Sequence, residues 1–317
     1  MIVHSTREVA RRYRLIVPVL AIIALTACHR AAPATPATSN PAASAASAAP
    51  PAPSGDSAPT IPNASTPASA LAPTPTAAAV ARGRELLATW KAAAGGDALT
   101  TFRSLELIGT STMTGLRSPR RLTVAARYPN AFRLEEGPTS PNVPALRVAI
   151  GVLNDSGWMV GAVLAGDGRS TDPAVSRRAY TRAARQTMAG VMVGMNIAWL
   201  TDTGRYTVSD AGVADTGPDA GAPQLWLDGP DGRVGRIVFD PTTHLPRRLV
   251  EPPQPGGGGT AALVETTFTY SDIGMQHGYP LPKTIVRTNG TTITTWTMTT
   301  FGVNAKLPAS RFAPGGR

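Results

Sequence analysis

From residue 102 onward, apolar and polar residues alternate with a period of two along much of the chain. Leu105, Leu107 and Gly109 fall on one face of the first such segment, and Glu106 and Ile108 fall on the other. This alternation is typical of β-strands. Similar segments, bounded by turn residues, predict further strands at about 119–128, 131–136, 145–153, 157–164, 204–210, 223–228, 233–240, 246–251, 261–271, 282–289 and 291–301.

Two segments have a helical period instead. The first covers about 77–94 and stops at Gly95-Gly96. Its apolar residues share one face at helical spacing: Val80, Leu87, Trp90 and Ala94. The second covers about 173–199 and begins at Asp172-Pro173, a capping residue followed by proline in the first turn.

Many short strands with antiparallel connections and two helical segments predict a mainly β fold with helices (α+β). The expected architecture is a half-open, curved antiparallel β-barrel with helices covering its concave face. No repeat of fixed period links the strands, which disfavours a propeller.

The N-terminus has the order of a secretory signal. A basic stretch precedes a short apolar core at 15–25, which ends in Leu25-Thr26-Ala27-Cys28. This core is too short to span a bilayer, which needs roughly 20 residues. The segment resembles a bacterial lipobox, which implies thioether lipidation of Cys28, cleavage before it and acylation of the new N-terminus by a fatty acid such as palmitate. The alternative is an ordinary signal peptide with a chance cysteine.

Three regions follow from these patterns: a signal peptide at 1–27, a linker at 28–76 and a folded domain at 77–317. The linker consists almost entirely of Ala, Pro, Ser and Thr. It contains too few large apolar side chains to offset the entropy of ordering, so we expect it to be disordered. It either acts as a semi-rigid stalk above the membrane or is simply tolerated low-complexity sequence.

Charge narrows the range of partners. The formal net charge is +10, and residues 1–27 contain four Arg and one Glu, so the remainder carries +7. The basic residues form no run of five or more, and the chain is predicted to be secreted, so nucleic acid is not an expected partner. A positive surface suits an anionic membrane face. The single cysteine allows no internal disulfide.

The sequence indicates no catalytic or metal centre, and it implies no cofactor. Outside the signal, His29, His244 and His277 lack the spacing of metal ligands, and no cysteine ligands are available. The strained Gly-x-Ser-x-Gly turn of a serine hydrolase is absent. Acidic pairs that resemble acid/base dyads sit at predicted strand ends or turns, where solvated carboxylates are ordinary: Glu135 with Glu136, and Asp228 with Asp231.

An apolar stripe on the second helical segment is the main candidate for a ligand surface. Met188, Met192 and Met195 recur at spacings of four and three, and Val191 and Trp199 fall on or beside that face. Such a stripe is either a packed core or a lid that faces an apolar ligand, for which methionine is well suited. Three strand tryptophans either join this cavity or face the opposite surface: Trp158, Trp226 and Trp296.

Several short motifs occur in a distinctive order. They are Trp90-Lys91-Ala92-Ala93-Ala94-Gly95-Gly96-Asp97-Ala98-Leu99, Phe102-Arg103-Ser104-Leu105, Tyr128-Pro129-Asn130-Ala131-Phe132-Arg133, Asn154-Asp155-Ser156-Gly157-Trp158, Phe239-Asp240-Pro241-Thr242-Thr243-His244-Leu245-Pro246, Tyr270-Ser271-Asp272-Ile273 and Leu307-Pro308-Ala309-Ser310-Arg311-Phe312. In this order they resemble periplasmic proteins related to the outer-membrane lipoprotein-sorting factors LolA and LolB. The resemblance implies a half-barrel whose apolar concave face receives acyl chains.

The leading functional hypothesis is a membrane-anchored periplasmic lipoprotein that binds lipid, acyl chains or lipidated protein in this half-barrel. The alternative is a non-catalytic structural or assembly partner of envelope proteins. The residue after Cys28 is not aspartate, which points to the periplasmic face of the outer membrane, with the inner membrane as the other choice. The sequence does not determine the oligomeric state.

Overall fold

The computed structural model describes residues 74–139, 147–154, 156–161, 173–255 and 263–315. All of these belong to the C-terminal of two units, Pro67–Arg317. The predicted signal peptide, Cys28 and nearly all of the predicted linker lie outside the described residues. So do 162–172 and Asp155.

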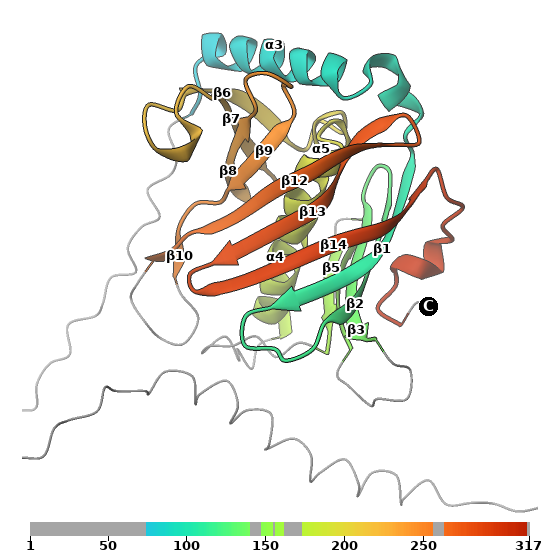
Figure 1. The fold of residues 1–317 in the computed structure, drawn as a ribbon. Helices are drawn as coiled ribbons and strands as arrows, with labels where there is room; N and C mark the ends of the chain where they lie inside the picture. The colour runs from blue at the N-terminus through green and yellow to red at the C-terminus, as the bar shows by residue number, and fades with distance from the viewer. Residues whose placement is uncertain (1–73, 140–146, 155, 162–172, 256–262, 316–317) are drawn as a thin grey trace, which may run out of the picture. The chain divides into compact units, whose positions relative to one another are not determined.

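A single twelve-stranded antiparallel sheet dominates the described residues, with the strand order β5-β4-β3-β2-β1-β14-β13-β12-β9-β8-β7-β6 (Figure 1). The end strands β5 and β6 do not pair with each other, so the sheet is open. The strands are β1 (Ser104–Met113), β2 (Arg120–Arg127), β3 (Ala131–Pro138), β4 (Val148–Leu153), β5 (Ser156–Val160), β6 (Thr207–Val213), β7 (Pro223–Gly229), β8 (Gly232–Phe239), β9 (Pro246–Val250), β12 (Thr266–Gln276), β13 (Tyr279–Asn289) and β14 (Thr292–Val303). A separate two-stranded pair is formed by β10 (Gln254–Pro255) and β11 (Leu263–Val264).

The predicted fold class is confirmed: the described domain is mainly β, and two main helices pack on the sheet. The longer helix, α4 (Pro173–Met195), lies on one face and contacts β4, β5, β8, β9 and β13 (Figure 1). The sheet residues on that face are fully buried apolar side chains such as Leu105, Leu107 and Leu122. The alternation predicted from the sequence therefore produces one continuous core between α4 and the sheet.

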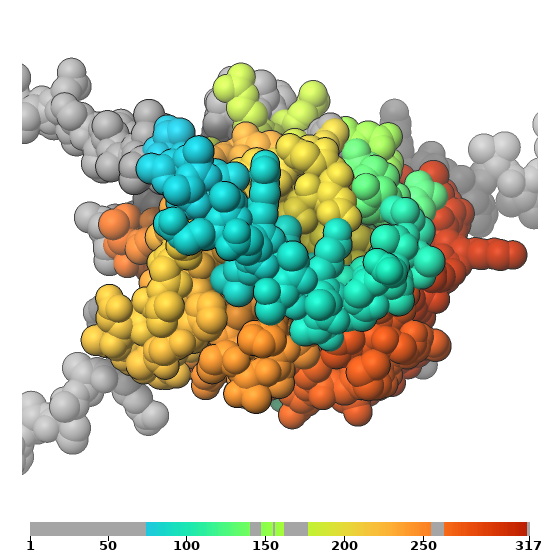
Figure 2. Space-filling model, turned by 90° about the horizontal axis from the view of Figure 1, so that it is seen from above, coloured from blue at the N-terminus to red at the C-terminus, as the bar shows by residue number. Residues whose placement is uncertain are grey.

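The other main helix, α3 (Ala77–Ala93), packs on the edge strand β6. Thr76 caps it, because its Oγ1 accepts a hydrogen bond from the Ala79 amide at 3.2 Å. Gly83 allows close contact, since a Cβ there would lie 2.8 Å from the Ser209 backbone. Figure 2 shows this helix in cyan running over one end of the molecule. Thr76 is therefore the N-cap of α3.

The second helical segment differs from the continuous helix predicted at 173–199. It breaks at Asn196 and resumes as the short helix α5 (Ala198–Thr201). The side-chain oxygen of Asn196 accepts a hydrogen bond from the Ala198 amide at 3.1 Å. An asparagine that bonds to the backbone two residues on favours a turn over a continuing helix.

The β12–β13 hairpin is longer than predicted. Its strands run to Gln276 and from Tyr279, and the turn is His277-Gly278, with φ of 52° and 87°. Positive φ at both central residues matches the twist of the flanking strands, which allows a two-residue connection.

The remaining described elements are short 3₁₀ helices, η2 (Gly96–Thr101), η3 (Gly217–Asp219) and η4 (Ala309–Phe312). None of the helices in the described ranges combines the length and the apolar character needed to cross a membrane.

Candidate functional site

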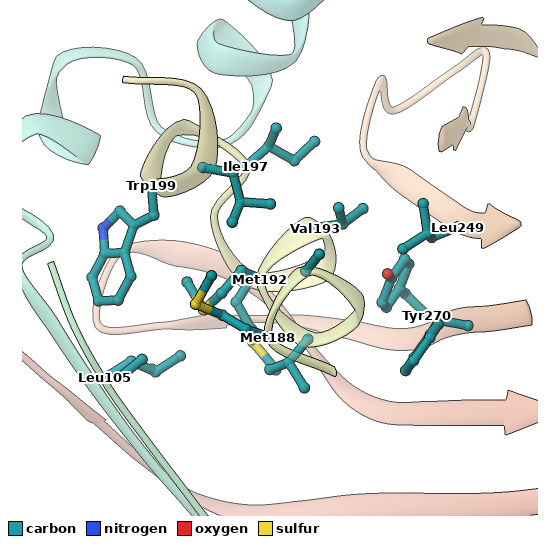
Figure 3. Close-up of a cluster of buried hydrophobic side chains, with 14 of the residues drawn as sticks. Leu105, Met188, Met192, Val193, Ile197, Trp199, Leu249 and Tyr270 are labelled. Carbon is teal, nitrogen blue, oxygen red and sulfur yellow. The ribbon is translucent and has the colours of Figure 1, made fainter. Parts of the chain in front are cut away.

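The apolar stripe predicted on the second helical segment faces the sheet. Its five members are buried, with exposed fractions between 1% and 8%: Met188, Val191, Met192, Met195 and Trp199. Figure 3 shows Met188 and Met192 between α4 and the strand that carries Leu105, while Leu249 and Tyr270 lie on the other side of the helix. The stripe is therefore packed as core in this structure. Its role in binding a ligand stays a prediction.

Two glycines on α4 bring the helix unusually close to strand β12. A Cβ added to Gly190 would lie 2.4 Å from the Phe268 ring, and one added to Gly194 would lie 2.4 Å from the Tyr270 ring. The Tyr270 hydroxyl also donates a hydrogen bond to the Gly190 carbonyl at 2.7 Å. No larger residue fits at either position without a shift of the helix or the ring.

Because α4 sits so close, the interior between helix and sheet is almost filled. A cavity of about 20 Å³ lies beside α4 and α5 and is lined in part by Met188, Trp199, Val152 and Tyr206. That volume has room for roughly one water molecule. An acyl chain enters this interior only if α4 moves.

The three strand tryptophans divide between the two faces of the sheet. Trp296 is inside: it is 5% exposed, and its ring centroid lies 6.2 Å from that of Phe268. Trp158 points away from α4, because its neighbour Gly157 faces the helix and its own Nε1 donates to the Phe312 carbonyl at 2.9 Å.

Trp226 also faces outward. It alternates with the fully buried Leu225 and Leu227, which face α4, and the Arg233 guanidinium lies 4.3 Å from its ring. Trp226 and Trp158 are therefore not part of the interior between α4 and the sheet.

The acidic pairs considered from the sequence are not brought together as dyads. The Glu136 Oε1 accepts hydrogen bonds inside the sheet, from Ser111 Oγ at 2.8 Å and Trp296 Nε1 at 2.9 Å. Glu135 points to the other face and pairs with Arg133 at 2.7 Å and with Arg147. Each of these carboxylates has structural partners.

Asp228 and Asp231 do not form a dyad either, because each is paired with a different arginine. Asp228 pairs with Arg233 at 2.5 Å, and Asp231 pairs with Arg185 at 2.8 Å. His244 and His277 occupy turns at positive φ. Within the described ranges, no three His, Cys, Asp or Glu side chains are grouped so that they could hold a metal ion.

Sequence reasoning missed one buried carboxyl group, that of Glu251 at the end of β9. Glu251 is 5% exposed, and its Oε1 has no hydrogen-bond donor among the described residues. Burial raises the pKa of this carboxyl to about 7, and the positive charge of Arg287 opposes the rise only in part. One feature of the sequence points to this unpartnered carboxyl: Glu251 is followed by Pro252 and Pro253, which have no amide hydrogen to donate.

This group predicts a pH dependence of stability. The folded protein keeps the Glu251 proton up to about pH 7, whereas the unfolded chain loses it near its ordinary pKa of 4.5, so the folded state binds more protons between these values. The contribution of Glu251 to stability is therefore greatest below pH 4.5 and falls by up to ~3 kcal/mol as the pH rises to 7. Denaturant unfolding of wild type and Glu251→Gln at pH 4.5 and 7 checks this, since the variant is expected to gain relative to wild type at the higher pH. A constant difference between the two proteins contradicts it.

Comparisons with known proteins give structural matches only. No known family model matches the chain, and no curated protein matches it. Among solved structures, an outer membrane lipoprotein-sorting protein domain from Vibrio parahaemolyticus has 11% identity and a TM-score of 0.44, over 74% of this chain and 97% of that chain.

A LolA superfamily protein from Nitrosomonas europaea has 13% identity and a TM-score of 0.41, over 67% of this chain and 89% of that chain. A DUF1329 family protein from Desulfovibrio piger has 10% identity and a TM-score of 0.41, over 74% of this chain and 98% of that chain. The predicted resemblance is thus confirmed as a structural similarity at low sequence identity.

Proposed function

We propose that this protein is an envelope lipoprotein that binds an acyl chain, of a lipid or of a lipidated protein, between α4 and the inner face of the sheet. The observation that carries the proposal is the packing of α4, which meets the sheet through methionines and glycines. Methionine is flexible and adapts to varied apolar partners. In this proposal α4 is a plug that occupies the acyl site until a ligand displaces it.

Among the described residues, the polar bonds between α4 and the rest of the domain are few, and this supports an exchangeable plug. The Thr181 Oγ1 accepts a hydrogen bond from the Gly157 amide at 3.1 Å. Tyr270 donates to the Gly190 carbonyl. Arg185 pairs with Asp231 at 2.8 Å, and the two side chains are 17% and 35% exposed. An ion pair near the surface contributes about 0–1 kcal/mol. Most of the contact between α4 and the sheet is therefore apolar. An acyl chain that enters in its place recovers roughly 0.8 kcal/mol for each CH₂ group that it buries.

A second candidate function is docking of another envelope protein without a small ligand. It is favoured by the filled interior together with two exposed apolar residues on one face of β12, Ile273 at 40% and Met275 at 67% exposed. Exposed apolar residues that cluster are typical of interaction surfaces. In this case α4 is a permanent part of the core.

Titration of the full chain with a fluorescent fatty acid separates the two functions. If the protein binds acyl chains, we expect saturable binding of one probe molecule and displacement of that probe by unlabelled fatty acid. An absence of saturable binding at probe concentrations below micelle formation contradicts the proposal and leaves docking as the function.

Anchoring through Cys28 is a separate proposal, supported by the lipobox-like sequence. Cys28→Ala is expected to release the protein from the membrane fraction and to remove the mass of the attached lipid. Several acyl chains make detachment negligible at roughly 0.8 kcal/mol per buried CH₂. Fractionation and intact-mass analysis check this, and equal partition of wild type and variant contradicts it. Separation of inner and outer membranes tests the proposed outer-membrane location.

A further inference from the structure

A second hollow lies outside the packed interior. It has a volume of about 920 Å³ and is bordered by α4, the β7–β8 hairpin and the end of β9. Arg182 and Gln186 contribute from α4, Trp226 from β7, and Glu251 and Glu265 from the segments beside β9 and β12. Its volume is in the range of small-molecule sites, whereas the interior cavity of about 20 Å³ is not.

Glu251 is the one side chain lining this groove that is both buried and unpartnered among the described residues. Its backbone amide is already used, since it donates to the Thr266 carbonyl at 2.8 Å. The next two residues are Pro252 and Pro253, which have no amide hydrogen to offer. A buried acceptor without a donor is costly, so a donor that arrives through the groove gains free energy by bonding to it.

The neighbouring charges are mostly satisfied within the protein. Arg185 and Arg233, which also line the groove, are paired with Asp231 and Asp228. Glu251 forms no ion pair within the described residues. An ammonium group suits this acceptor, because it brings three hydrogen-bond donors and a positive charge that balances the negative charge of the carboxylate.

We propose that the groove is a binding site for a primary ammonium group, with the Glu251 carboxylate as its acceptor. The site does not require α4 to move and is independent of acyl binding. The ammonium has two possible sources, a free amine or the headgroup of an aminophospholipid. Arg182 at the groove adds a contact for the phosphate of the second source.

Calorimetric titration of the full chain with hexylamine, hexanol and phosphoethanolamine tests the site, because none of these carries a long acyl chain. Wild type is expected to bind hexylamine about tenfold more tightly than Glu251→Gln does, at pH 8. The matched control is Glu265→Gln, an exposed carboxylate of the same groove, whose affinity is expected to equal that of wild type. Tighter binding of phosphoethanolamine than of hexylamine identifies a headgroup, and the reverse identifies a free amine.

The pH dependence of the wild type gives a second readout that needs no variant. Binding of hexylamine is expected to weaken from pH 8 to pH 5 as Glu251 takes up its proton. The charged or titratable groups that share the groove or act on Glu251 are, besides the two ion pairs, Arg182 on α4, Tyr206, Arg236 on β8, Glu265, Tyr270 on β12 and Arg287 on β13. Arg236 donates a hydrogen bond to the Gln224 side-chain oxygen at 3.2 Å. Equal affinity for hexylamine in wild type and Glu251→Gln, or equal affinity for hexanol and hexylamine, overturns the proposal whether or not fatty acid binds elsewhere.

Discussion

Replacing Gly190 with alanine is expected to destabilise the protein and, at the same time, to tighten binding of a fatty-acid probe. The new Cβ would lie 2.4 Å from the ring of Phe268, which is 1% exposed and cannot swing away. Overpacking of this kind costs about 1–3 kcal/mol. We call the state in which α4 packs on the sheet the closed state. If the ligand binds only after α4 leaves the sheet, the overpacking raises the free energy of the closed state alone. The probe affinity then rises about tenfold for each 1.4 kcal/mol of this destabilisation.

Chemical denaturation and probe titration of the same samples check this result. The matched control is Gly137→Ala on β3, where the added Cβ meets only the Arg147 Cγ at 4.0 Å. We expect the control to match wild type in both measurements. If Gly190→Ala loses both stability and probe affinity, α4 is not a plug, because the ligand then binds while α4 is still packed on the sheet.

Replacing Met192 with glutamate is expected to have the largest effect on stability. Met192 is 1% exposed and lies in the core between α4 and the sheet (Figure 3). A carboxylate without a partner at such a position costs several kcal/mol, and the same charge would face the acyl chain in the proposed complex. Both the melting temperature and the probe binding are therefore expected to fall.

Met192→Leu is the control for this variant. The exchange conserves volume and apolar character, so we expect a change of less than about 1.5 kcal/mol and retained probe binding. The readouts are thermal unfolding by circular dichroism and probe fluorescence. A folded Met192→Glu protein that binds the probe like wild type removes this face of α4 from the site.

The strands were predictable because alternation along each of them reflects burial on one face of the sheet. Leu105 and Leu107 illustrate this, since both are fully buried against α4 as the pattern predicts. Alternation does not say which face of a distant strand turns inward. Trp158 and Trp296 have similar strand contexts, yet only Trp296 faces the interior.

The candidate site was less predictable, for a physical reason. The stripe of Met188, Met192 and Met195 has the same apolar pattern whether it packs against protein or against a ligand. Two features that decide its packing are visible in the sequence only after the fold is known. Gly190 and Gly194 matter because Phe268 and Tyr270 lie opposite them, although those residues are far away along the chain. Glu251 likewise became notable only once its burial was seen.

Photo-cross-linking tests the central claim, that an acyl chain takes the place of α4 on the inner face of the sheet. The full chain is irradiated with a fatty acid that carries a photoreactive group along its chain, and the labelled peptides are mapped by mass spectrometry. If an acyl chain lies there, labels are expected on the inner face of α4, at Met188–Met195, and on the facing residues of β1 and β14, and unlabelled fatty acid is expected to suppress all of them. Labels confined to outward-facing residues such as Ile273 and Met275, or no label that competes with fatty acid, would contradict it.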